Sequence, residues 1–161
     1  MTAGKTGGVP VLLVRHAVAL ARRKWSGPDG LRPLTPRGVR QAEGLPEMLG
    51  DYEIQRVLSS PAVRCVDTVG PLAKDRGLEI EETDDLAEGT RHLALARVKA
   101  CASTPSALCS HGDVIPWVLN ALVDRDGVDL GPEPKCAKGS TWALEFEGSR
   151  CTRARYIPPP A

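Results

Sequence analysis

Three short apolar segments of this chain each lead into side chains that can hold an anion. Arg15 and His16 end the first segment, Arg64 follows the second, and His111 follows the third. Guanidinium and imidazolium groups bind phosphoryl oxygens through charge-assisted hydrogen bonds. If these two arginines and two histidines meet at one point, the sequence indicates a phosphate site.

The elements that must bring these residues together alternate between strand and helix. This alternation predicts a single α/β domain, a three-layer sandwich with a mostly parallel central sheet and helices on both faces. Strands are expected at residues 9–14, 54–58, 78–81, 106–109, 140–146 and 150–156, and helices at 36–49, 60–76, 93–102 and 111–122. Ligands bind such sheets at the carboxyl ends of the strands. Just after strands come Arg15, His16, Arg64, Glu88 and His111.

Two of the expected helices begin with the same signal, a hydroxyl residue followed by proline. Thr35-Pro36 and Ser60-Pro61 each offer an N-cap side chain and a proline at the first helical position. The second helix then carries Arg64 in its first turn. Free N–H groups and the helix dipole favour an anion there, so the arginine adds a donor to an already favourable place.

Length and charge limit the classes of function. The chain has 161 residues with 21 basic and 20 acidic side chains, so no basic face for a nucleic acid polymer is expected. No apolar stretch approaches the roughly 18 residues of a membrane helix, and no signal-peptide core is present. We therefore expect a cytoplasmic protein that binds no membrane. Its expected organisation is a disordered tail at 1–8, one domain at 9–157 and a tail at 158–161.

The five cysteines argue against several alternative chemistries. They are widely spaced and contain no Cys-x-x-Cys pair, so neither a disulfide framework nor a metal site is indicated. None has an arginine six residues later, which excludes the Cys-x5-Arg phosphatase loop. Gly4-Lys5-Thr6 lies too close to the start to complete a P-loop. No metal and no cofactor are expected.

The spaced motifs resemble those of the histidine phosphatase superfamily, also called phosphoglycerate mutase-like. That family carries Arg-His-Gly near its N-terminus, an arginine after a Ser-Ser-Pro turn and a late His-Gly pair. Here the counterparts are Arg15-His16-Ala17, Ser59-Ser60-Pro61 with Arg64, and His111-Gly112. The resemblance covers about residues 9–157. Ala17 departs from the usual glycine.

The resemblance implies a role for each of these residues. His16 would be the nucleophile that forms a phosphohistidine intermediate, while Arg15, Arg64 and His111 would hold the phosphoryl oxygens. Many members use a carboxylate after the third strand to protonate the leaving group, and Glu88 matches that region best. The order of fallback for this acid is Asp85, Asp84 and Glu82.

The substrate stays open at this stage. Only residues 65–110 separate Arg64 from His111, too few for the large insertion of the mutases, so an open site is expected. That suits a phosphohistidine-bearing protein or a phosphorylated small molecule. The stretch containing Arg22, Trp25 and Asp29 also resembles the phosphatase domain that follows a Nudix hydrolase domain, which keeps nucleotides as an alternative. Arg22 would then bind a distal phosphate. A non-catalytic phosphate-binding module is the rival from another class.

Overall fold

The computed structural model describes residues 7–161, and its centre is one six-stranded sheet. Residues 1–6, which hold most of the tail expected to be disordered, lie outside the described residues. The strand order is β3-β2-β4-β1-β5-β6. The strands are β1 (Val9–Arg15), β2 (Arg56–Ser59), β3 (Ile80–Glu82), β4 (Ser106–Ser110), β5 (Thr141–Glu147) and β6 (Arg150–Ile157).

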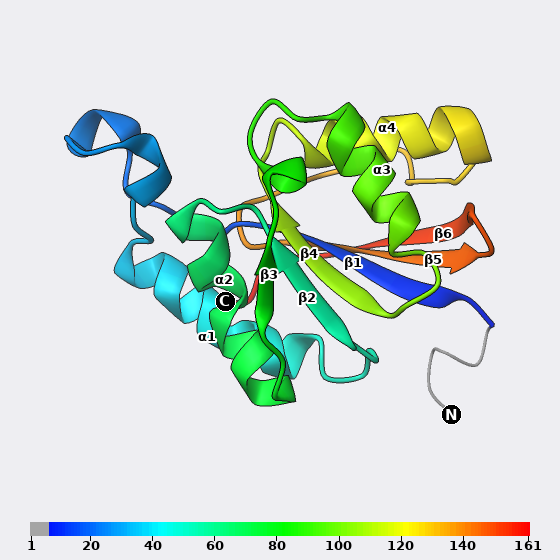
Figure 1. The fold of residues 1–161 in the computed structure, drawn as a ribbon, viewed down its shortest axis with the longest axis horizontal. Helices are drawn as coiled ribbons and strands as arrows, with labels where there is room; N and C mark the ends of the chain where they lie inside the picture. The colour runs from blue at the N-terminus through cyan, green and yellow to red at the C-terminus, as the bar shows by residue number, and fades with distance from the viewer. Residues whose placement is uncertain (1–6) are drawn as a thin grey trace.

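The sheet is mostly parallel, as the sequence predicts. Strands β3, β2, β4 and β1 pair in parallel, whereas β5 and β6 pair antiparallel at one edge. Arg15 of β1 is in register with Ser110 of β4, and Ser59 of β2 is in register with Cys109. The carboxyl ends of these three strands therefore lie next to one another (Figure 1).

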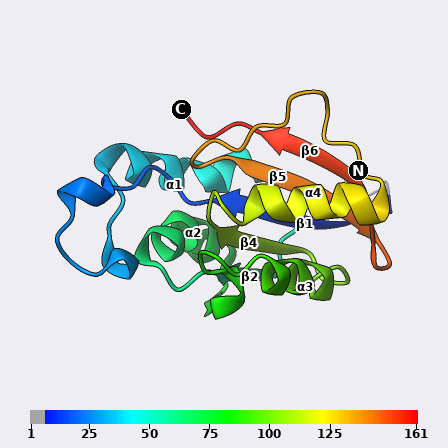
Figure 2. The same ribbon diagram turned by 90° about the horizontal axis from the view of Figure 1, so that it is seen from above.

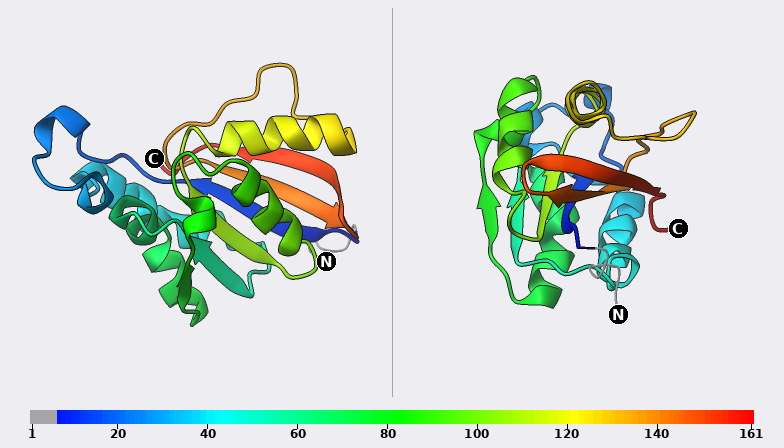
Figure 3. Two further views of the ribbon diagram at one scale, coloured as in Figure 1. Left: turned by 45° about the horizontal axis from the view of Figure 1, so that its top comes forward. Right: turned by 90° about the vertical axis from the view of Figure 1, so that its right-hand side faces the viewer.

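Helices cover both faces of the sheet. Helices α1 (Pro36–Met48) and α2 (Val63–Arg76) lie on one side, and α3 (His92–Ala100) and α4 (Ile115–Asp126) lie on the other (Figure 3, right). Alternate residues of β1 point into the two layers, because side chains alternate along a strand. Leu12 and Val14 pack toward α1 and α2, whereas Val11 and Leu13 pack toward α3 and α4. The expected three-layer sandwich is confirmed.

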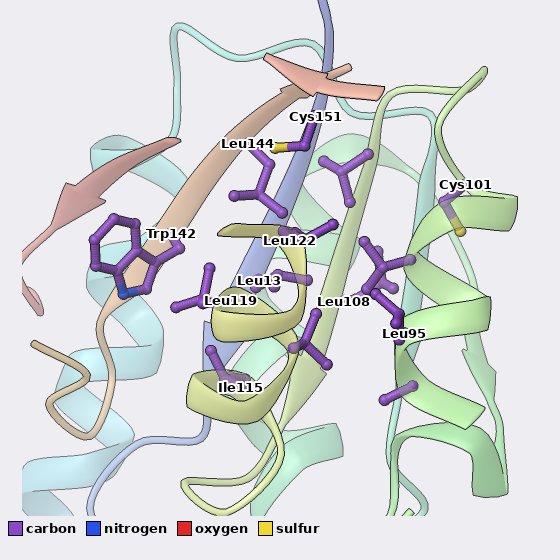
Figure 4. Close-up of a cluster of buried hydrophobic side chains, with 14 of the residues drawn as sticks. Leu13, Leu95, Cys101, Leu108, Ile115, Leu119, Leu122, Trp142, Leu144 and Cys151 are labelled. Atoms are coloured by element: carbon purple, nitrogen blue, oxygen red, sulfur yellow. The ribbon is translucent and has the colours of Figure 1, made fainter. Parts of the chain in front are cut away.

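The larger apolar cluster lies beneath α3 and α4. Figure 4 shows Leu119 and Leu122 of α4 facing Leu13, Leu108 and Leu144 of the sheet. All of these side chains are buried. Each fully buried aliphatic side chain of this kind contributes on the order of 1.5–3 kcal/mol. This packing holds the central strands β1 and β4 rigid and thereby fixes their carboxyl ends.

The expected start of α1 is confirmed, while that of α2 is wrong by a few residues. The Thr35 hydroxyl accepts a hydrogen bond from the Gly38 N–H and caps α1. Helix α2 begins at Val63 after an Ala62 cap, without a side-chain cap from Ser60. The Ser60 hydroxyl instead accepts from the Ala62 N–H and contacts His111, so it closes a turn.

The expected helix start at His111 is also wrong. Residues 112–114 form a turn whose closing bonds run from the N–H groups of Val114 and Ile115 to the His111 carbonyl. Helix α4 then begins at Ile115, with Pro116 in its first turn, and ends at Asp126, where Gly127 caps it with a φ of 74°. Proline favours the first helical turn, so Pro116 was the better start signal.

The segment between β1 and α1 projects beyond the sheet. It contains two single-turn 3-10 helices, η2 (Arg22–Lys24) and η3 (Asp29–Leu31), which stand out from the body at the end where the parallel strands finish (Figure 1). An antiparallel bridge between Ala19 and Leu34 closes its base. Within residues 7–161, no helix has the length and apolar character to cross a membrane.

Candidate active site

The sheet places His16 and His111 side by side. The His16 N–H donates to the Ser110 carbonyl at 3.1 Å, so the residue after β1 lies beside the end of β4. The two imidazole rings meet edge to face with centroids 5.4 Å apart. The parallel register of β1 and β4 thus joins two motifs that are 95 positions apart in the sequence (111 − 16).

The environment of His16 leaves one ring nitrogen free for attack. Its Nδ1 lies 2.8 Å from the Ala17 carbonyl, which can only accept, so Nδ1 carries the proton and Nε2 has a lone pair. The residue is buried, with 7% of its surface exposed. Burial lowers the pKa of His16 to about 3. The hydrogen bond to Ala17 acts in the opposite direction and raises this pKa, whereas the nearby His111, Arg64 and Arg15 lower it further.

The ring of His111 is held through its Nε2 atom by contacts with Ser60 and Cys65. Its Nε2 lies 2.9 Å from the Ser60 hydroxyl and 3.6 Å from the Cys65 sulfur. The Ser60 oxygen also accepts from the Ala62 N–H, and a hydroxyl has one donor and two acceptor sites, so Ser60 can bond His111 in either protonation state. Buried Nδ1 of His111 has no hydrogen-bond partner among residues 7–161. The second histidine therefore presents an unused nitrogen.

The Arg15 side chain packs closely against Gly112 and is fixed at one end. Its Nη1 donates to the Cys136 carbonyl at 2.6 Å, while its buried Nε has no partner within the described chain. A Cβ added at Gly112 would lie 2.6 Å from the Arg15 guanidinium carbon. This close approach explains why the residue after His111 is glycine: a larger side chain there would displace the Arg15 guanidinium.

Arg64 is almost fully buried, with 1% of its surface exposed. Its Nη1 donates to the Asp29 carbonyl at 2.9 Å, and its Nη2 pairs with the Asp29 carboxylate at 3.1 Å and with the Glu88 carboxylate at 3.2 Å. The buried Nε has no partner in the part of the chain described. The projecting loop therefore reaches back through Asp29 to orient this arginine.

Glu88 lies between two arginines. One carboxylate oxygen pairs with Arg64, and the other pairs with Arg22 at 2.8 Å. The loop that carries it is tied to the turn before α4, because the Gly89 N–H donates to the Asp113 carboxylate at 2.8 Å. The structure thus brings both Glu88 and Arg22 to the histidine pair.

The fallback carboxylates lie elsewhere. Asp85 pairs with Arg97 of α3 at 2.7 Å, and Glu82 lies exposed at the end of β3. Asp84 lines a neighbouring cleft with Glu88. Among the acidic residues considered from the sequence, Glu88 is the one that lines the same cavity as His16.

The cavity over His16 has a volume of about 350 Å³ and is open to solvent. A second cleft of about 460 Å³ adjoins it, and Glu88 lines both. Lining the first cavity are Arg15, His16, Ala19, Ala21, Arg22, Arg32, Glu88, Gly112, Asp113 and Lys138. The expectation of an open site agrees with this shape. Across residues 7–161, no group of three or more metal-ligating side chains comes together.

Sequence reasoning did not assign roles to several residues at the site. Asp29 and Ser60 enter the sequence analysis only as parts of motifs, and Asp113 and Lys138 have no predicted role. Their contacts depend on long-range packing, so spacing alone offers no signal for them. The exposed Arg23, Lys24 and His92 do not line the cavity, and His92 packs against Trp117 with centroids 4.6 Å apart.

Comparisons with solved structures support the fold. The putative phosphohistidine phosphatase SixA from Nakamurella multipartitia superposes with a TM-score of 0.76 at 24% identity, covering 96% of this chain and 98% of that one. The protein histidine phosphatase SixA complexed with tungstate gives 0.72 at 20% identity, covering 95% and 97%. At these identities the likeness establishes the architecture.

Sequence comparisons establish the family. The chain is 32% identical over 157 residues to an 8-oxo-(d)GTP phosphatase of Mycolicibacterium smegmatis (strain ATCC 700084 / mc(2)155). The match covers 93% of this chain and 48% of the relative, so the chain spans about half the length of that protein. The model of the histidine phosphatase superfamily (branch 1) matches residues 11–92. The chain therefore belongs to the histidine phosphatase superfamily.

Proposed function

We propose that this protein is a phosphatase that hydrolyses phosphomonoesters or phosphohistidine through a covalent phosphohistidine on His16. The observation that carries the proposal is a set of three buried nitrogens without a partner among residues 7–161, Nε of Arg15, Nε of Arg64 and Nδ1 of His111. Buried N–H groups are rarely left unpaired in proteins. A phosphoryl group bound over His16 would supply the missing acceptors.

The first step is attack by Nε2 of His16 on phosphorus. Because its pKa is lowered to about 3, the ring is neutral at pH 7, and the Nδ1–H bond to Ala17 aims Nε2 away from the backbone. The N–P bond forms as the bond from phosphorus to the leaving oxygen breaks. Water then attacks the phosphohistidine, which releases phosphate and restores His16.

Three groups would stabilise the charge that spreads over the phosphoryl oxygens. Arg15, Arg64 and His111 each offer one or more N–H donors from a rigid element, and a charge-assisted hydrogen bond contributes about 1.5–3 kcal/mol. The contacts of Arg64 with Asp29 and of Arg15 with Cys136 fix their orientation before substrate arrives. Such preorganisation lowers the cost of reaching the transition state.

Glu88 would supply the proton for an alcohol leaving group. Its carboxylate lines the cavity over His16 and, without substrate, pairs with Arg22 and Arg64. An incoming phosphoryl group competes for Arg64 and frees one carboxylate oxygen to face the leaving group. Arg22 would remain at the rim, where it can contact a more distal anionic group.

The open cavity suits both a phosphohistidine-bearing protein and a phosphorylated small molecule. The similarity to an 8-oxo-(d)GTP phosphatase supports nucleotides as the second candidate class. We assign the activity to one domain, residues 9–157, that needs no metal or cofactor, membrane or nucleic acid polymer. All five cysteines are free, which favours a reducing compartment and hence the cytoplasm.

The test is hydrolysis of p-nitrophenyl phosphate with EDTA present. Wild type should turn over, and His16→Ala should lose on the order of a thousandfold or more in kcat. His92→Ala is the matched control because His92 is exposed and lies outside the cavity. A phosphoenzyme trapped in alkali should be absent from His16→Ala. Equal rates for wild type and His16→Ala would refute the nucleophile and leave the non-catalytic module as the better description.

A further inference from the structure

Of the cationic residues that line the cavity over His16, one has no partner for its charged group within residues 7–161. Arg22 pairs with Glu88, and Arg32 pairs with Asp29 at 3.0 Å. Lys138 lines the same cavity, and its ammonium group makes no hydrogen bond or ion pair with any other of residues 7–161. An unpaired positive charge beside a phosphate site attracts a further negative charge.

The backbone at Lys138 is fixed to the nucleophile strand. The Gly139 N–H donates to the carbonyls of Arg15 at 3.1 Å and His16 at 3.0 Å, and the Arg15 N–H donates to Ser140 at 3.0 Å. The Lys138 carbonyl accepts from the Gln41 side chain at 3.4 Å. These bonds fix the backbone of Lys138, which directly precedes the residue that contacts His16, Gly139. The Lys138 side chain itself is exposed.

The long irregular segment between α4 and β5, residues 127–140, places Lys138 at the site. Helix α4 runs away from the site, and the segment after it comes back along the sheet to the start of β5 at the site edge (Figure 2). Gly139 ends that return with a φ of 82°, which favours glycine. Lys138 therefore lies three residues before the start of β5 at Thr141, at the site edge of the sheet.

We infer that Lys138 forms a second anion subsite, so that the preferred substrates carry a negative group next to the phosphoryl group transferred to His16. This inference rests on the proposed function and narrows its substrate class to phosphoanhydrides such as diphosphate esters. The first phosphoryl group uses Arg15, Arg64 and His111. The adjoining phosphoryl group then lies toward the cavity mouth, where the mobile ammonium of Lys138 offers three donors.

The chemistry is balanced for a diphosphate ester. Nε2 of His16 forms a bond to the terminal phosphorus, and the bond from that phosphorus to the bridging oxygen breaks. The electron pair stays on the bridging oxygen, which leaves as part of the inner phosphate. Lys138 stabilises the charge that develops there, so this leaving group needs no proton from Glu88. Water then cleaves the N–P bond, releasing orthophosphate and a proton.

The test compares binding of inorganic phosphate with binding of imidodiphosphate, which holds two phosphoryl groups on a nitrogen bridge that resists hydrolysis. Isothermal titration calorimetry gives both dissociation constants without turnover, so the result is independent of whether His16 is the nucleophile. In wild type, imidodiphosphate should bind about tenfold more tightly than phosphate, as one charge-assisted contact predicts. In Lys138→Ala this ratio should fall toward one, and in Lys138→Arg it should recover in part.

Lys135→Ala is the control, because Lys135 is an exposed lysine of the same segment that lines a different cleft. It should keep the wild-type ratio. An unchanged ratio in Lys138→Ala, or an equal loss in Lys135→Ala, overturns the subsite. Failure of His16→Ala to lose p-nitrophenyl phosphate hydrolysis would instead overturn the proposed function and leave the binding result standing.

Discussion

Asp29 holds the guanidinium of Arg64 by two groups at once, with its carbonyl 2.9 Å from Nη1 and its carboxylate 3.1 Å from Nη2. The same carboxylate accepts from Arg32 at 3.0 Å. Burial alone would raise the pKa of Asp29, but the hydrogen bond from Arg32 and the charges of Arg64, Arg32 and Arg22 lower it. The projecting loop thus places an ionised carboxylate where it orients a buried arginine.

Replacing Asp29 by alanine should weaken catalysis through Arg64. The backbone contact would remain, but Nη2 would lose a partner and the guanidinium could rotate away from the phosphoryl group. A displacement of about 1 Å can cost on the order of a hundredfold in rate, so kcat/KM for p-nitrophenyl phosphate should fall about 10- to 100-fold. Asp51→Ala is the control, because Asp51 lies in an exposed turn and lines neither the cavity over His16 nor the adjoining cleft. Equal kinetics for the two variants would contradict the orienting role.

Glu88→Gln should separate binding from chemistry. Glutamine removes the negative charge that competes with substrate for Arg22 and Arg64, so KM for phosphomonoesters should fall. It also removes the acid, so kcat for alkyl phosphates should drop about 10²- to 10⁴-fold while that for phosphohistidine changes little. Steady-state kinetics on both substrates measure the split. A uniform fall in kcat would argue against Glu88 as the acid.

The arrangement of strands could be predicted from the sequence because it depends on local signals. A run of branched aliphatic residues marks the buried strand β1, a short apolar run marks β4, and Thr35-Pro36 marks the start of α1. The start of α2 was misplaced for a specific reason. Ser60 carries the same local signal as Thr35, but its hydroxyl contacts His111, a partner that only the folded sheet brings near.

Most of the candidate site residues could be predicted because they follow strands in the sequence. The sheet brings the carboxyl ends of those strands to one edge. Asp29 and Lys138 lack such a signal. Asp29 reaches Arg64 from a loop that projects beyond the sheet, and Lys138 lines the cavity over His16 at the end of a long irregular return. Loop paths depend on tertiary contacts such as those of Gly139, so residue types alone could not predict them.

Gly112→Ala should reduce activity by displacing Arg15. The new methyl group would lie 2.6 Å from the guanidinium carbon, closer than any real contact, so the side chain must move off its site. We expect kcat/KM to fall at least about tenfold, as for loss of one charge-assisted hydrogen bond. Gly70→Ala is the control: it lies within α2 and has no atom within 4 Å of an added Cβ. It should keep activity and gain about 0.5–1 kcal/mol of stability in urea unfolding.

The lowered pKa of His16 also predicts how stability depends on pH. The unfolded state takes up a proton near pH 6.5, whereas the folded state resists protonation until about pH 3. Acid therefore favours the unfolded chain between these values, and the contribution of His16 to the free energy of unfolding declines as pH falls below 6.5. At pH 5 the loss relative to pH 7.5 should be about 2 kcal/mol.

His16→Asn isolates this effect, because asparagine can still donate to the Ala17 carbonyl but does not titrate. Urea unfolding of both proteins at pH 7.5 and pH 5 gives the comparison. Other titrating groups contribute equally to the two proteins, so the variant should lose about 2 kcal/mol less than wild type on acidification. An equal loss would mean that His16 protonates as readily in the folded protein as in the unfolded chain. The ring would then be cationic at pH 5 and unable to attack phosphorus.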